Sequence, residues 1–555
     1  MADQAAETPH PGEDLLRVAE VVHAGEVSVT FKPGPTVLAK VGDKLLDIAE
    51  ASQLPIESGC RMGMCGSDPV RVLEGEDNLS AVRSAERRTL ERLGLADGCR
   101  MACVSRVQGP VVVDPRSPLQ EPTEADADET PTPIAAADPA VEAAVRRVVV
   151  VGAGVAGVTS AEELRRALPG AELILVGDEP YDFYNRMAIT RLVSESASID
   201  SLYLNRRDWA ESRRVDFRRG VPATAIDREN RQVAIADGER LPYDRVVIAT
   251  GARPFVPPIE GFGAEGSFVL RTIDDAVQLQ QYIRRMRCRT AVIVGGGLLG
   301  LELAYNVLQL DVRVLVLDRG RWPLRRQLDE QSGALLWEML QDLGIELIAQ
   351  SEAQRVHADE RVTGVELLDG TMLEAELCIV TTGIVPNVEL AEAAGLDVEV
   401  GITVDDGMRT SDPDIFAVGD VAQRNGRPHG LWPASVEQAQ VAAANMAGGE
   451  VAFVHATPPA RLKVPGIDLL SIGAVDATGE SRTVVVSAYG TRKYRKLILE
   501  HGRLTGAIIL GSPELFDDVT TAVETGLEVG TELDALEHGK WEALSRAVEG
   551  ETLAS

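Results

Sequence analysis

An apolar run that ends in closely spaced glycines does most to limit what this 555-residue chain can fold into. Residues 148–151 are all valine, as expected of a parallel strand that is buried on both faces. The turn that follows contains Gly152, Ala153, Gly154 and Gly157, which let backbone N–H groups approach a ligand and let the next helix pack closely on the strand. Because the positive end of that helix favours anions, the segment predicts a dinucleotide-binding turn.

The same pattern occurs again at residues 291–300, where an apolar run leads into Gly295, Gly297 and Gly300. A single turn of this kind can be an ordinary connection between a strand and a helix. Two of them, each after an apolar strand and before a helix, predict two dinucleotide sites in an α/β fold with two Rossmann-like modules.

An acidic residue at the end of the next strand is expected to bind the ribose of each dinucleotide. Glu179 has this place in the first copy of the pattern and Asp318 in the second. A carboxylate at Asp318 suits the ribose hydroxyls of NADH and should repel the extra phosphate of NADPH, so we expect NADH there. Arg319 and Arg321 stand next to it and could bind that phosphate, which leaves NADPH open.

Residues 410–420, with the sequence TSDPDIFAVGD, resemble the second FAD signature of the pyridine-nucleotide disulfide oxidoreductase superfamily. The resemblance implies that Asp420 holds the ribityl chain of FAD. Residues 246–254 and 380–387 are similar to the turns that carry the chain between the FAD and nicotinamide modules of this family. Further cofactor contacts that the resemblance implies are Arg186, Thr250, Gly251, Gly383 and Gly419.

Two segments resemble a narrower group. Residues 181–186 and 431–439 are similar to the rubredoxin or putidaredoxin reductases and to the flavoprotein portion of NADH-dependent nitrite reductases, and this resemblance covers about 147–511. Glu302, which follows the second glycine turn, resembles the glutamate that the family places near the nicotinamide and is our catalytic candidate. Its alternative role is a charge in the first turn of a helix.

Four of the six cysteines lie between residues 60 and 103, which favours a metal site over a disulfide framework. Their spacing resembles a plant-type [2Fe–2S] ferredoxin, in which C-x₄-C-x₂-C is followed by a distant fourth cysteine. The resemblance implies Cys60, Cys65 and Cys103 as iron ligands. The third position of the pattern is occupied by Asp68.

Three explanations of this departure stay open. Asp68 could bind iron through its carboxylate, although oxygen ligands are harder than thiolates and less suited to iron–sulfur chemistry. Cys99, which is close to Cys103 in sequence, could instead complete the ligand set or support another type of cluster. The cluster could also be degenerate or absent, leaving a folded ferredoxin domain without redox function.

We predict two Rossmann-like modules, an N-terminal β-grasp ferredoxin domain and a small α+β C-terminal domain. Residues 114–145 are rich in Pro, Thr, Ala, Asp and Glu and have no hydrophobic periodicity, so we expect a flexible linker there. The expected limits are an acidic arm at 1–17, the ferredoxin-like domain at 18–113, the linker at 114–145, the FAD domain at 146–285 and 380–455, the NAD(P)H domain at 286–379, a C-terminal interface domain at 456–530 and an acidic tail at 531–555.

The formal net charge of −31 argues against nucleic acid or an anionic membrane as a partner, because polyanions would be repelled. Residues 1–14 lack the apolar core of a signal peptide, and no run is apolar enough to span a bilayer, so we expect a cytoplasmic protein. By resemblance, the C-terminal domain implies dimer contacts or a shield over the flavin, so a homodimer is possible.

Together these patterns imply an iron–sulfur flavoenzyme of the ferredoxin–NAD(P)⁺ reductase type. NAD(P)H, FAD and a [2Fe–2S] cluster would exchange electrons with an external one-electron acceptor or donor protein. Two other interpretations stay open. The ferredoxin-like domain could be a redox or oxygen sensor on an NADH oxidase or diaphorase. The chain could also be the reductase component for a nitrite reductase or a monooxygenase.

Overall fold

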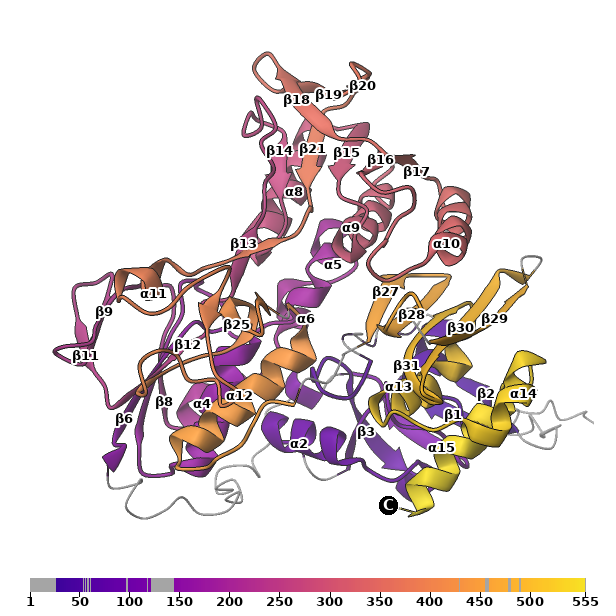
Figure 1. Cartoon of the computed structure of the whole chain (residues 1–555), viewed down its shortest axis with the longest axis horizontal. Helices are drawn as coiled ribbons and strands as arrows, with labels where there is room; N and C mark the ends of the chain where they lie inside the picture. Colours follow the sequence, from indigo (N-terminus) through magenta and orange to yellow (C-terminus); the bar gives the residue numbers. More distant parts are fainter. Residues whose placement is uncertain are drawn as a thin grey trace, which may run out of the picture. The chain divides into compact units, whose positions relative to one another are not determined.

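The computed structural model describes residues 26–52, 54, 56, 59, 61–95, 98–116, 118–120, 144–428, 430–454, 459–477, 481–488 and 491–554 (Figure 1). The chain divides into two compact units, Met1–Thr123 and Glu124–Ser555. The arm expected at 1–17 lies outside the described residues, as does most of the linker expected at 114–145, from residue 121 to 143.

The first unit is a five-stranded mixed sheet with the order β2-β1-β5-β3-β4. The central strands β1 and β5 are parallel, and β2 pairs with β1 in the antiparallel sense. Phe31, Leu45, Val70 and Met101 are fully buried in its core. This is the expected β-grasp arrangement, built from β1 (Glu26–Phe31), β2 (Thr36–Lys40), α1 (Leu45–Ala51), β3 (Pro69–Glu74), α2 (Ser84–Leu93), β4 (Cys99–Met101) and β5 (Val111–Asp114).

A buried ion pair fixes α2 against β4 in this unit. Arg100 Nε donates to Glu86 Oε1 at 2.8 Å and Arg100 Nη2 donates to Glu86 Oε2 at 3.2 Å, with side chains that are 2% and 1% exposed. Glu86 Oε1 also accepts the backbone N–H of Met101 at 3.0 Å. The pair therefore holds the strand that leads into Cys103.

The second unit begins with a parallel five-stranded sheet in the order β24-β12-β6-β7-β8. Its glycine-flanked strand, β6, lies at the centre, and α12 packs on α4, as Figure 1 shows. The strands and helices of this first module are β6 (Arg147–Val151), α4 (Val155–Ala167), β7 (Glu172–Val176), β8 (Val215–Arg218), β12 (Arg245–Ile248), β24 (Ile415–Ala417) and α12 (Trp432–Met446). A small antiparallel sheet is formed by β9 (Ala223–Asp227), β10 (Gln232–Ile235) and β11 (Arg240–Pro242).

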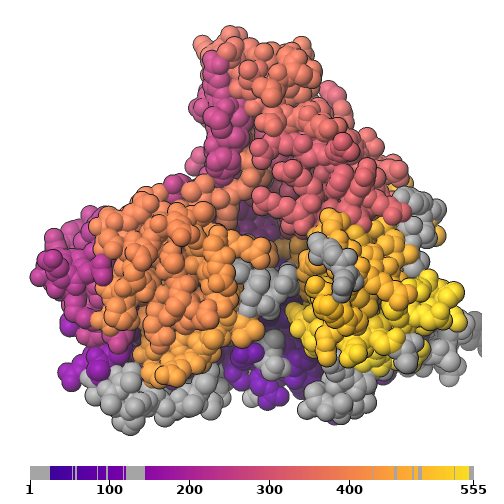
Figure 2. Space-filling model, viewed as in Figure 1, coloured from indigo at the N-terminus to yellow at the C-terminus, as the bar shows by residue number. Residues whose placement is uncertain are grey.

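A second parallel sheet, in the order β14-β21-β15-β16-β17, repeats this arrangement. Figure 2 shows this module as a lobe that stands out from the rest of the second unit. Its elements are β14 (Ser267–Val269), α8 (Ile273–Met286), β15 (Thr290–Val294), α9 (Leu298–Leu308), β16 (Arg313–Asp318), α10 (Glu330–Asp342), β17 (Ile345–Ala349) and β21 (Leu377–Val380). A side sheet is formed by β18 (Ala353–Ala358), β19 (Val362–Leu367) and β20 (Met372–Glu374).

The chain crosses between the two modules twice, and the crossings pair with each other. β13 (Ala252–Pro254) runs antiparallel to β22 (Ile384–Pro386). Thr250 Oγ1 donates to the carbonyl oxygen of Asn387 at 2.8 Å, and Asn387 Nδ2 donates to the carbonyl oxygen of Thr250 at 2.8 Å. The expected turns at 246–254 and 380–387 are thus joined at one point.

The C-terminal part is an antiparallel sheet in the order β27-β28-β31-β30-β29, covered by helices. Leu536, Trp541 and Leu544 belong to the segment expected to be an acidic tail, 531–555, yet they are buried in the same core as this sheet. The elements are β27 (Ala460–Val464), β28 (Ile467–Gly473), β29 (Arg482–Ala488), β30 (Lys493–Glu500), β31 (Arg503–Leu510), α13 (Phe516–Glu524), α14 (Leu533–Glu537) and α15 (Glu542–Ala554).

A carboxylate ties this sheet to the second module. Asp329 caps α10, and its Oδ2 accepts from Lys496 Nζ at 2.8 Å and from the Tyr494 hydroxyl at 2.5 Å. Burial alone would raise the pKa of Asp329, but Lys496 and the hydrogen-bonding hydroxyls hold it below its usual value. Within the described part of the chain, no helix combines the length and apolar character that crossing a bilayer requires.

We expect the buried Glu86–Arg100 pair to control the stability of the first unit. Glu86→Ala leaves an uncompensated buried guanidinium, so it should lower the free energy of unfolding of this unit by about 3–5 kcal/mol. Glu74→Ala is the matched control, because Glu74 is 71% exposed and its ion pair with Lys32 spans 3.8 Å. That variant should cost less than about 1 kcal/mol.

Hydrogen exchange of the full chain in increasing urea, followed on peptides from 84–114, measures the stability of the first unit alone. Equal losses in the two variants would show that the buried pair does not stabilise this unit.

Candidate functional site

The first glycine turn leaves no room for side chains at two of its three glycines. A Cβ on Gly152 would lie 2.1 Å from the carbonyl oxygen of Ala249, and one on Gly157 would lie 1.7 Å from the carbonyl oxygen of Gly152. Gly152 also has a φ of 109°, which favours glycine. Around Gly154 there is open space within 4 Å. The first helix is therefore packed directly on the strand, and its N-terminus faces an open cradle.

The second turn repeats this geometry. A Cβ on Gly300 would lie 2.0 Å from the carbonyl oxygen of Gly295, and one on Gly295 would lie 2.7 Å from that of Thr381, whereas Gly297 has open space around it. Gly154 and Gly297 are the N-caps of α4 and α9, and neither helix has a side-chain cap. Two helix N-termini thus offer free backbone N–H groups to an anion such as a pyrophosphate.

Glu179, three residues after the end of β7, is held by two side chains from the loop that follows. Its Oε1 accepts from Arg186 Nη2 at 2.5 Å and its Oε2 accepts from the Tyr184 hydroxyl at 2.6 Å. Burial, then Glu179, raises the pKa of Tyr184 far above its usual value. Two of the expected FAD residues, Glu179 and Arg186, therefore lie together.

Asp420 is joined to the same cluster through an arginine that the sequence did not single out. Arg271 Nη2 donates to Asp420 Oδ2 at 2.7 Å, and the carbonyl oxygen of Arg271 accepts from Arg186 Nη1 at 2.8 Å. Arg271 lies in the turn between β14 and α8, where it matches no motif. Glu179, Arg186, Arg271 and Asp420 thus form one connected series.

Gly419 lies where the second FAD signature meets α4 and α12. Its φ is 81°, and a Cβ there would lie 2.9 Å from the Cβ of Ala156. Its N–H donates to Gln438 Oε1 of α12 at 2.7 Å. Gln438 Nε2 is buried and has no hydrogen-bond partner among the described residues. A buried donor of this kind calls for an acceptor, and FAD is rich in acceptors, so the residues fit this cofactor.

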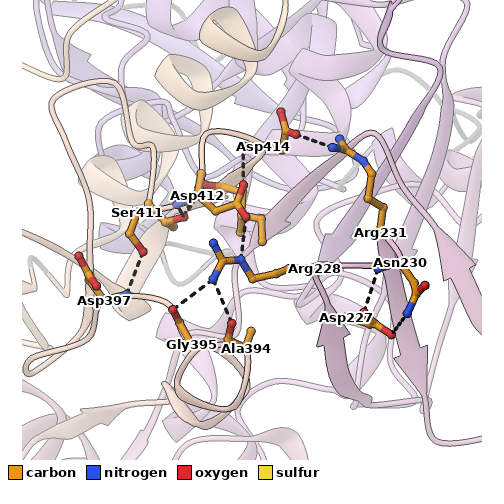
Figure 3. Close-up of polar contacts among 12 residues, drawn as sticks. Asp227, Arg228, Asn230, Arg231, Ala394, Gly395, Asp397, Ser411, Asp412 and Asp414 are labelled. Atoms are coloured by element: carbon orange, nitrogen blue, oxygen red, sulfur yellow. Dashed lines mark hydrogen bonds and ion pairs between the residues drawn. The ribbon is translucent and has the colours of Figure 1, made fainter.

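Ion pairs hold the second FAD signature against the β9–β10 hairpin (Figure 3). Arg228 Nε donates to Asp412 Oδ2 at 2.7 Å, and Arg228 Nη1 donates to the carbonyl oxygens of Ala394 and Gly395 at 3.3 and 3.2 Å. Arg231 Nη1 donates to Asp414 Oδ2 at 2.7 Å. Burial alone would raise the pKa of Asp412, but the N–H of Asp414 and the guanidinium of Arg228 hold it below its usual value. This network positions β24, the strand that leads to Asp420.

The crossings carry the remaining expected FAD and nicotinamide contacts. Thr250 makes the reciprocal pair with Asn387, and Gly251 and Gly383 adopt φ values of 65° and 130°. The carbonyl oxygen of Gly383 accepts the N–H of Phe255 at 2.9 Å. These residues therefore lie where the chain passes from one module to the other.

Asp318 supports the second glycine turn directly. Its Oδ2 accepts the N–H of Gly296 at 3.0 Å and its Oδ1 accepts the N–H of Gly320 at 2.6 Å. The side chain is half-buried at the end of β16. The structure places this carboxylate beside the open cradle at Gly297, where a ribose could reach it.

Glu302 lies beyond the first turn of α9, which contains no acidic residue, so its alternative role as a helix-start charge does not apply. It is only 7% exposed, and its Oε1 accepts the N–H of Lys463 in β27 at 3.1 Å. Burial raises the pKa of Glu302 above its usual value, although Lys463 opposes this shift. The Lys463 ammonium lies 3.5 Å from the carbonyl oxygen of Met187, next to Arg186. Sequence reasoning missed Lys463, because its contact with Glu302 spans 161 positions.

In the first unit, Asp68 and Cys103 are in direct contact, and Cys65 is buried close enough to both to raise their pKa values. Asp68 Oδ2 accepts the N–H of Cys103, and the sulfur of Cys103 accepts the N–H of Gly63 at 3.3 Å. Asp68 Oδ1 is buried without a hydrogen-bond partner among the described residues. Burial first, and then Cys65, raises the pKa of Asp68 to about 7. Burial and Asp68 raise the pKa of the Cys103 thiol well above its usual value.

Three buried acidic groups this close together are unfavourable as anions unless a cation neutralises them. The unpartnered carboxylate oxygen and the two buried sulfurs therefore fit iron. Cys60, the other expected ligand, lies outside the described residues. Among the described residues, no three histidine, cysteine or carboxylate side chains converge on a single metal ion. A two-iron cluster divides its four ligands between two ions, so this finding concerns single-ion sites.

Cys99 is separated from these groups by the pairing of β3 with β4. It lies opposite Arg71, whereas Met101 lies opposite Pro69, the residue after Asp68. Cys99 and Cys103 both belong to the hydrophobic core of the unit, so the strand register and not burial distinguishes them. The geometry thus favours Asp68 over Cys99 as the group next to Cys103.

Gly154, where a Cβ would meet open space, and Gly157, where a Cβ would overlap the backbone, give a matched test of the first turn. Gly154→Ala should fold normally, because its Cβ meets open space, but should bind FAD at least about tenfold more weakly, because the methyl group would stand where a pyrophosphate is expected. Gly157→Ala should impair folding itself, because its Cβ would overlap the carbonyl oxygen of Gly152. Thermal unfolding and bound-flavin absorbance separate these effects. Normal FAD binding by Gly154→Ala would contradict this placement of the pyrophosphate.

Three family models match the chain. Pyridine nucleotide-disulphide oxidoreductase matches residues 146–445, the rubredoxin NAD⁺ reductase C-terminal domain matches residues 458–527, and the 2Fe-2S iron-sulfur cluster binding domain matches residues 31–108. These matches confirm the expected fusion of a ferredoxin domain with a flavoprotein body. They imply FAD and NAD(P)H for the second unit and a [2Fe–2S] cluster for the first.

Relatives are similar over the flavoprotein body. The NAD(P)H nitrite reductase of Bacillus subtilis (strain 168) is 33% identical over 66% of this chain and 46% of that protein. The chain spans about half the length of this relative. Putidaredoxin reductase CamA of Pseudomonas putida is 33% identical over 54% of this chain and 74% of that protein.

A solved structure agrees with the fold. The crystal structure of the covalent putidaredoxin reductase–putidaredoxin complex is similar to this chain with a TM-score of 0.66 and 30% identity, over 73% of this chain and 99% of that chain. The expected α/β fold with two nucleotide-binding modules is confirmed. Since the first family model covers more than half of the 555 residues, the chain belongs to the pyridine nucleotide-disulphide oxidoreductase family.

Proposed function

We propose that this chain is an NAD(P)H-dependent FAD oxidoreductase that passes electrons between nicotinamide, FAD and a built-in [2Fe–2S] cluster, to or from a one-electron carrier protein. The observation that carries the proposal is the presence, in one chain, of two glycine turns with matching geometry and a buried cysteine–aspartate contact. When bound, nicotinamide and flavin supply hydride transfer, and the cluster supplies one-electron transfer.

The residues of the second unit would bind and orient the two nucleotides. The first turn would hold the FAD pyrophosphate, and Glu179 and Asp420 would hold the adenosine ribose and the ribityl chain. Arg186 and Arg271 fix these two carboxylates in place. The second turn and Asp318 would hold NAD(P)H. The domain limits expected from the sequence remain part of this proposal, with two changes: β14 and α8 go with the second module, and the helices after residue 531 go with the C-terminal sheet.

Glu302 and Lys463 would orient the nicotinamide end of the site. The second unit places them against each other and beside Met187, close to the cluster around Arg186. The Glu302 carboxyl group is buried and held by the backbone N–H of Lys463, so it can orient a polar ring from a fixed position without exchanging a proton. Glu302 therefore stays our catalytic candidate, and Lys463 is a positioning residue.

The cluster ligands in this proposal are Cys60, Cys65, Asp68 and Cys103. Asp68 is supported over Cys99 by its contact with Cys103 and by its unpartnered oxygen. The N–H of Gly63 that donates to the Cys103 sulfur is of the kind that tunes cluster potentials. We place the protein in the cytoplasm, where free cysteines stay reduced, and treat a homodimer as part of the proposal.

An external carrier is supported by the relatives named as NADH-rubredoxin oxidoreductase and putidaredoxin reductase. A role as the reductase component for nitrite reduction is a second candidate, because the nitrite reductases match over two thirds of the chain. The third candidate is a redox or oxygen sensor on an NADH oxidase, because one relative is named NADH oxidase.

Paired variants test the cluster ligands. Asp68→Ala should reduce the iron and acid-labile sulfide bound per chain to about half or less, because one of four ligands is lost, whereas Cys99→Ser should leave both unchanged. Asp68→Cys should retain iron and change the visible spectrum. Loss of iron from Cys99→Ser, with normal iron in Asp68→Ala, would assign the position to Cys99 instead.

Electron throughput tests the function itself. Anaerobic NADH or NADPH should bleach the flavin of the wild type and of Asp68→Ala at similar rates, because the second unit is unchanged. Reduction of a one-electron acceptor such as cytochrome c should fall about tenfold or more in Asp68→Ala if the cluster is the exit for electrons. An unchanged rate would favour a sensor or docking role for the first unit.

A further inference from the structure

Several arginines follow β16 within a short stretch of the chain. Residues 318–326 read DRGRWPLRR, with four arginines and one carboxylate in a chain whose formal net charge is −31. All four arginines, Arg319, Arg321, Arg325 and Arg326, are exposed. None of them forms a hydrogen bond or ion pair with the residues that the structure describes. By contrast, Arg313 at the start of the same strand pairs with Glu346 at 2.6 and 2.7 Å.

The segment is held rigidly over the second glycine turn. The N–H of Leu324 donates to the carbonyl oxygen of Gly296 at 3.1 Å, and Leu324 and Leu328 are 3% and 1% exposed. Trp322 packs on Gly333 of α10, and its indole N–H donates to the carbonyl oxygen of Leu328 at 3.1 Å. The arginines are therefore presented from a fixed loop at the nucleotide site.

Two of the arginines are placed beside Asp318. The Cδ of Arg325 lies 3.0 Å from the position a Cβ would take on Gly320, and the N–H of Gly320 donates to Asp318 Oδ1 at 2.6 Å. Arg319 is the residue after Asp318. Since a ribose is expected at this carboxylate, a group on the ribose 2′ position would meet guanidinium groups.

Asp318 is not a free negative charge. Each of its carboxylate oxygens accepts a backbone N–H, one from Gly296 and one from Gly320. These bonds fix its orientation and offset part of its charge. The expectation of NADH rested on repulsion between this carboxylate and a second phosphate, and four exposed arginines of the same loop oppose that repulsion.

We propose that Arg319 and Arg325, with Arg321 and Arg326 adding positive charge, form a subsite for the 2′-phosphate of NADPH, so that the chain uses NADPH. A guanidinium matches a phosphate with two parallel hydrogen bonds, and a dianionic phosphate is attracted by the field of the whole loop. This inference rests on the proposed function, because it places NAD(P)H at the second glycine turn.

Binding of adenosine fragments tests the subsite without turnover. Isothermal titration of the FAD-loaded full chain with 2′,5′-ADP and with 5′-ADP should show at least about tenfold tighter binding of 2′,5′-ADP at low salt, and a smaller preference at high salt. The double variant Arg319→Ala/Arg325→Ala should lose most of this preference and keep its affinity for 5′-ADP within about twofold.

Two further variants complete the design. Arg313→Ala, which removes a paired arginine from the other end of β16, should change neither affinity. Arg321→Ala/Arg326→Ala should weaken 2′,5′-ADP binding less than the first double variant does. Equal affinities for the two fragments in the wild type, or an undiminished preference in Arg319→Ala/Arg325→Ala, would overturn the proposal.

Flavin reduction separates this inference from the proposed function. NADPH should bleach the flavin, and Arg319→Ala/Arg325→Ala should lower kcat/KM for NADPH about tenfold or more while leaving that for NADH nearly unchanged. If NADH bleaches the flavin but 2′,5′-ADP shows no preference, the function stands and the subsite falls. If neither nucleotide bleaches the flavin although the preference is present, the subsite stands and the proposed function falls.

Discussion

The organisation of the second unit depends on the absence of a side chain at a few glycines. A Cβ on Gly157 would lie 1.7 Å from the carbonyl oxygen of Gly152, and one on Gly300 would lie 2.0 Å from that of Gly295. Only this closeness lets α4 and α9 begin directly on the ends of their strands. Both helix N-termini then face the carboxyl edge of a parallel sheet, where nucleotides bind in such folds. The acidic residues at the ends of the neighbouring strands, Glu179 and Asp318, reach the same edges.

Around these edges of the sheets, the polar and charged groups that lack a protein partner indicate where ligands bind. Arg186 and Arg271 are paired with Glu179 and Asp420, and Arg228 holds the segment before Asp420. Groups that lack a protein partner among the described residues stand out against this background. Three sets of them lie at the expected cofactor sites: Gln438 Nε2 near the first turn, the arginines that follow Asp318, and Asp68 Oδ1 in the first unit. Each fits a different ligand: an acceptor-rich flavin, a phosphate and iron.

Local spacing explains what the sequence could predict. The strand, turn and helix pattern at Gly152 and Gly295 is contained within about ten residues, and Glu179 and Asp318 follow at the ends of the next strands. Contacts across long stretches of chain left no local signal, as for Arg271 with Asp420 and Lys463 with Glu302. The C-terminal segment reads as an acidic tail, yet its apolar residues Trp541 and Leu544 are buried in the core of the C-terminal sheet.

The arrangement around Cys103 likewise could not be predicted from local spacing alone. Sequence distance puts Cys99 close to Cys103, but strand pairing sets Cys99 opposite Arg71 and brings Asp68 to the backbone of Cys103. The spacing of the cysteines could name the candidates, and the sheet register was needed to rank them. The domain limits and the individual site residues stay predictions, whereas the fold class and the family are confirmed.

The relay from nicotinamide through flavin to the cluster is the central claim. It is tested most directly by low-temperature electron paramagnetic resonance of the full chain during an anaerobic titration with NADPH or NADH. The account predicts that a signal typical of a reduced [2Fe–2S] centre grows in as the flavin absorbance falls. Flavin bleaching without such a signal, with none appearing after dithionite is added to the same tube, would contradict it.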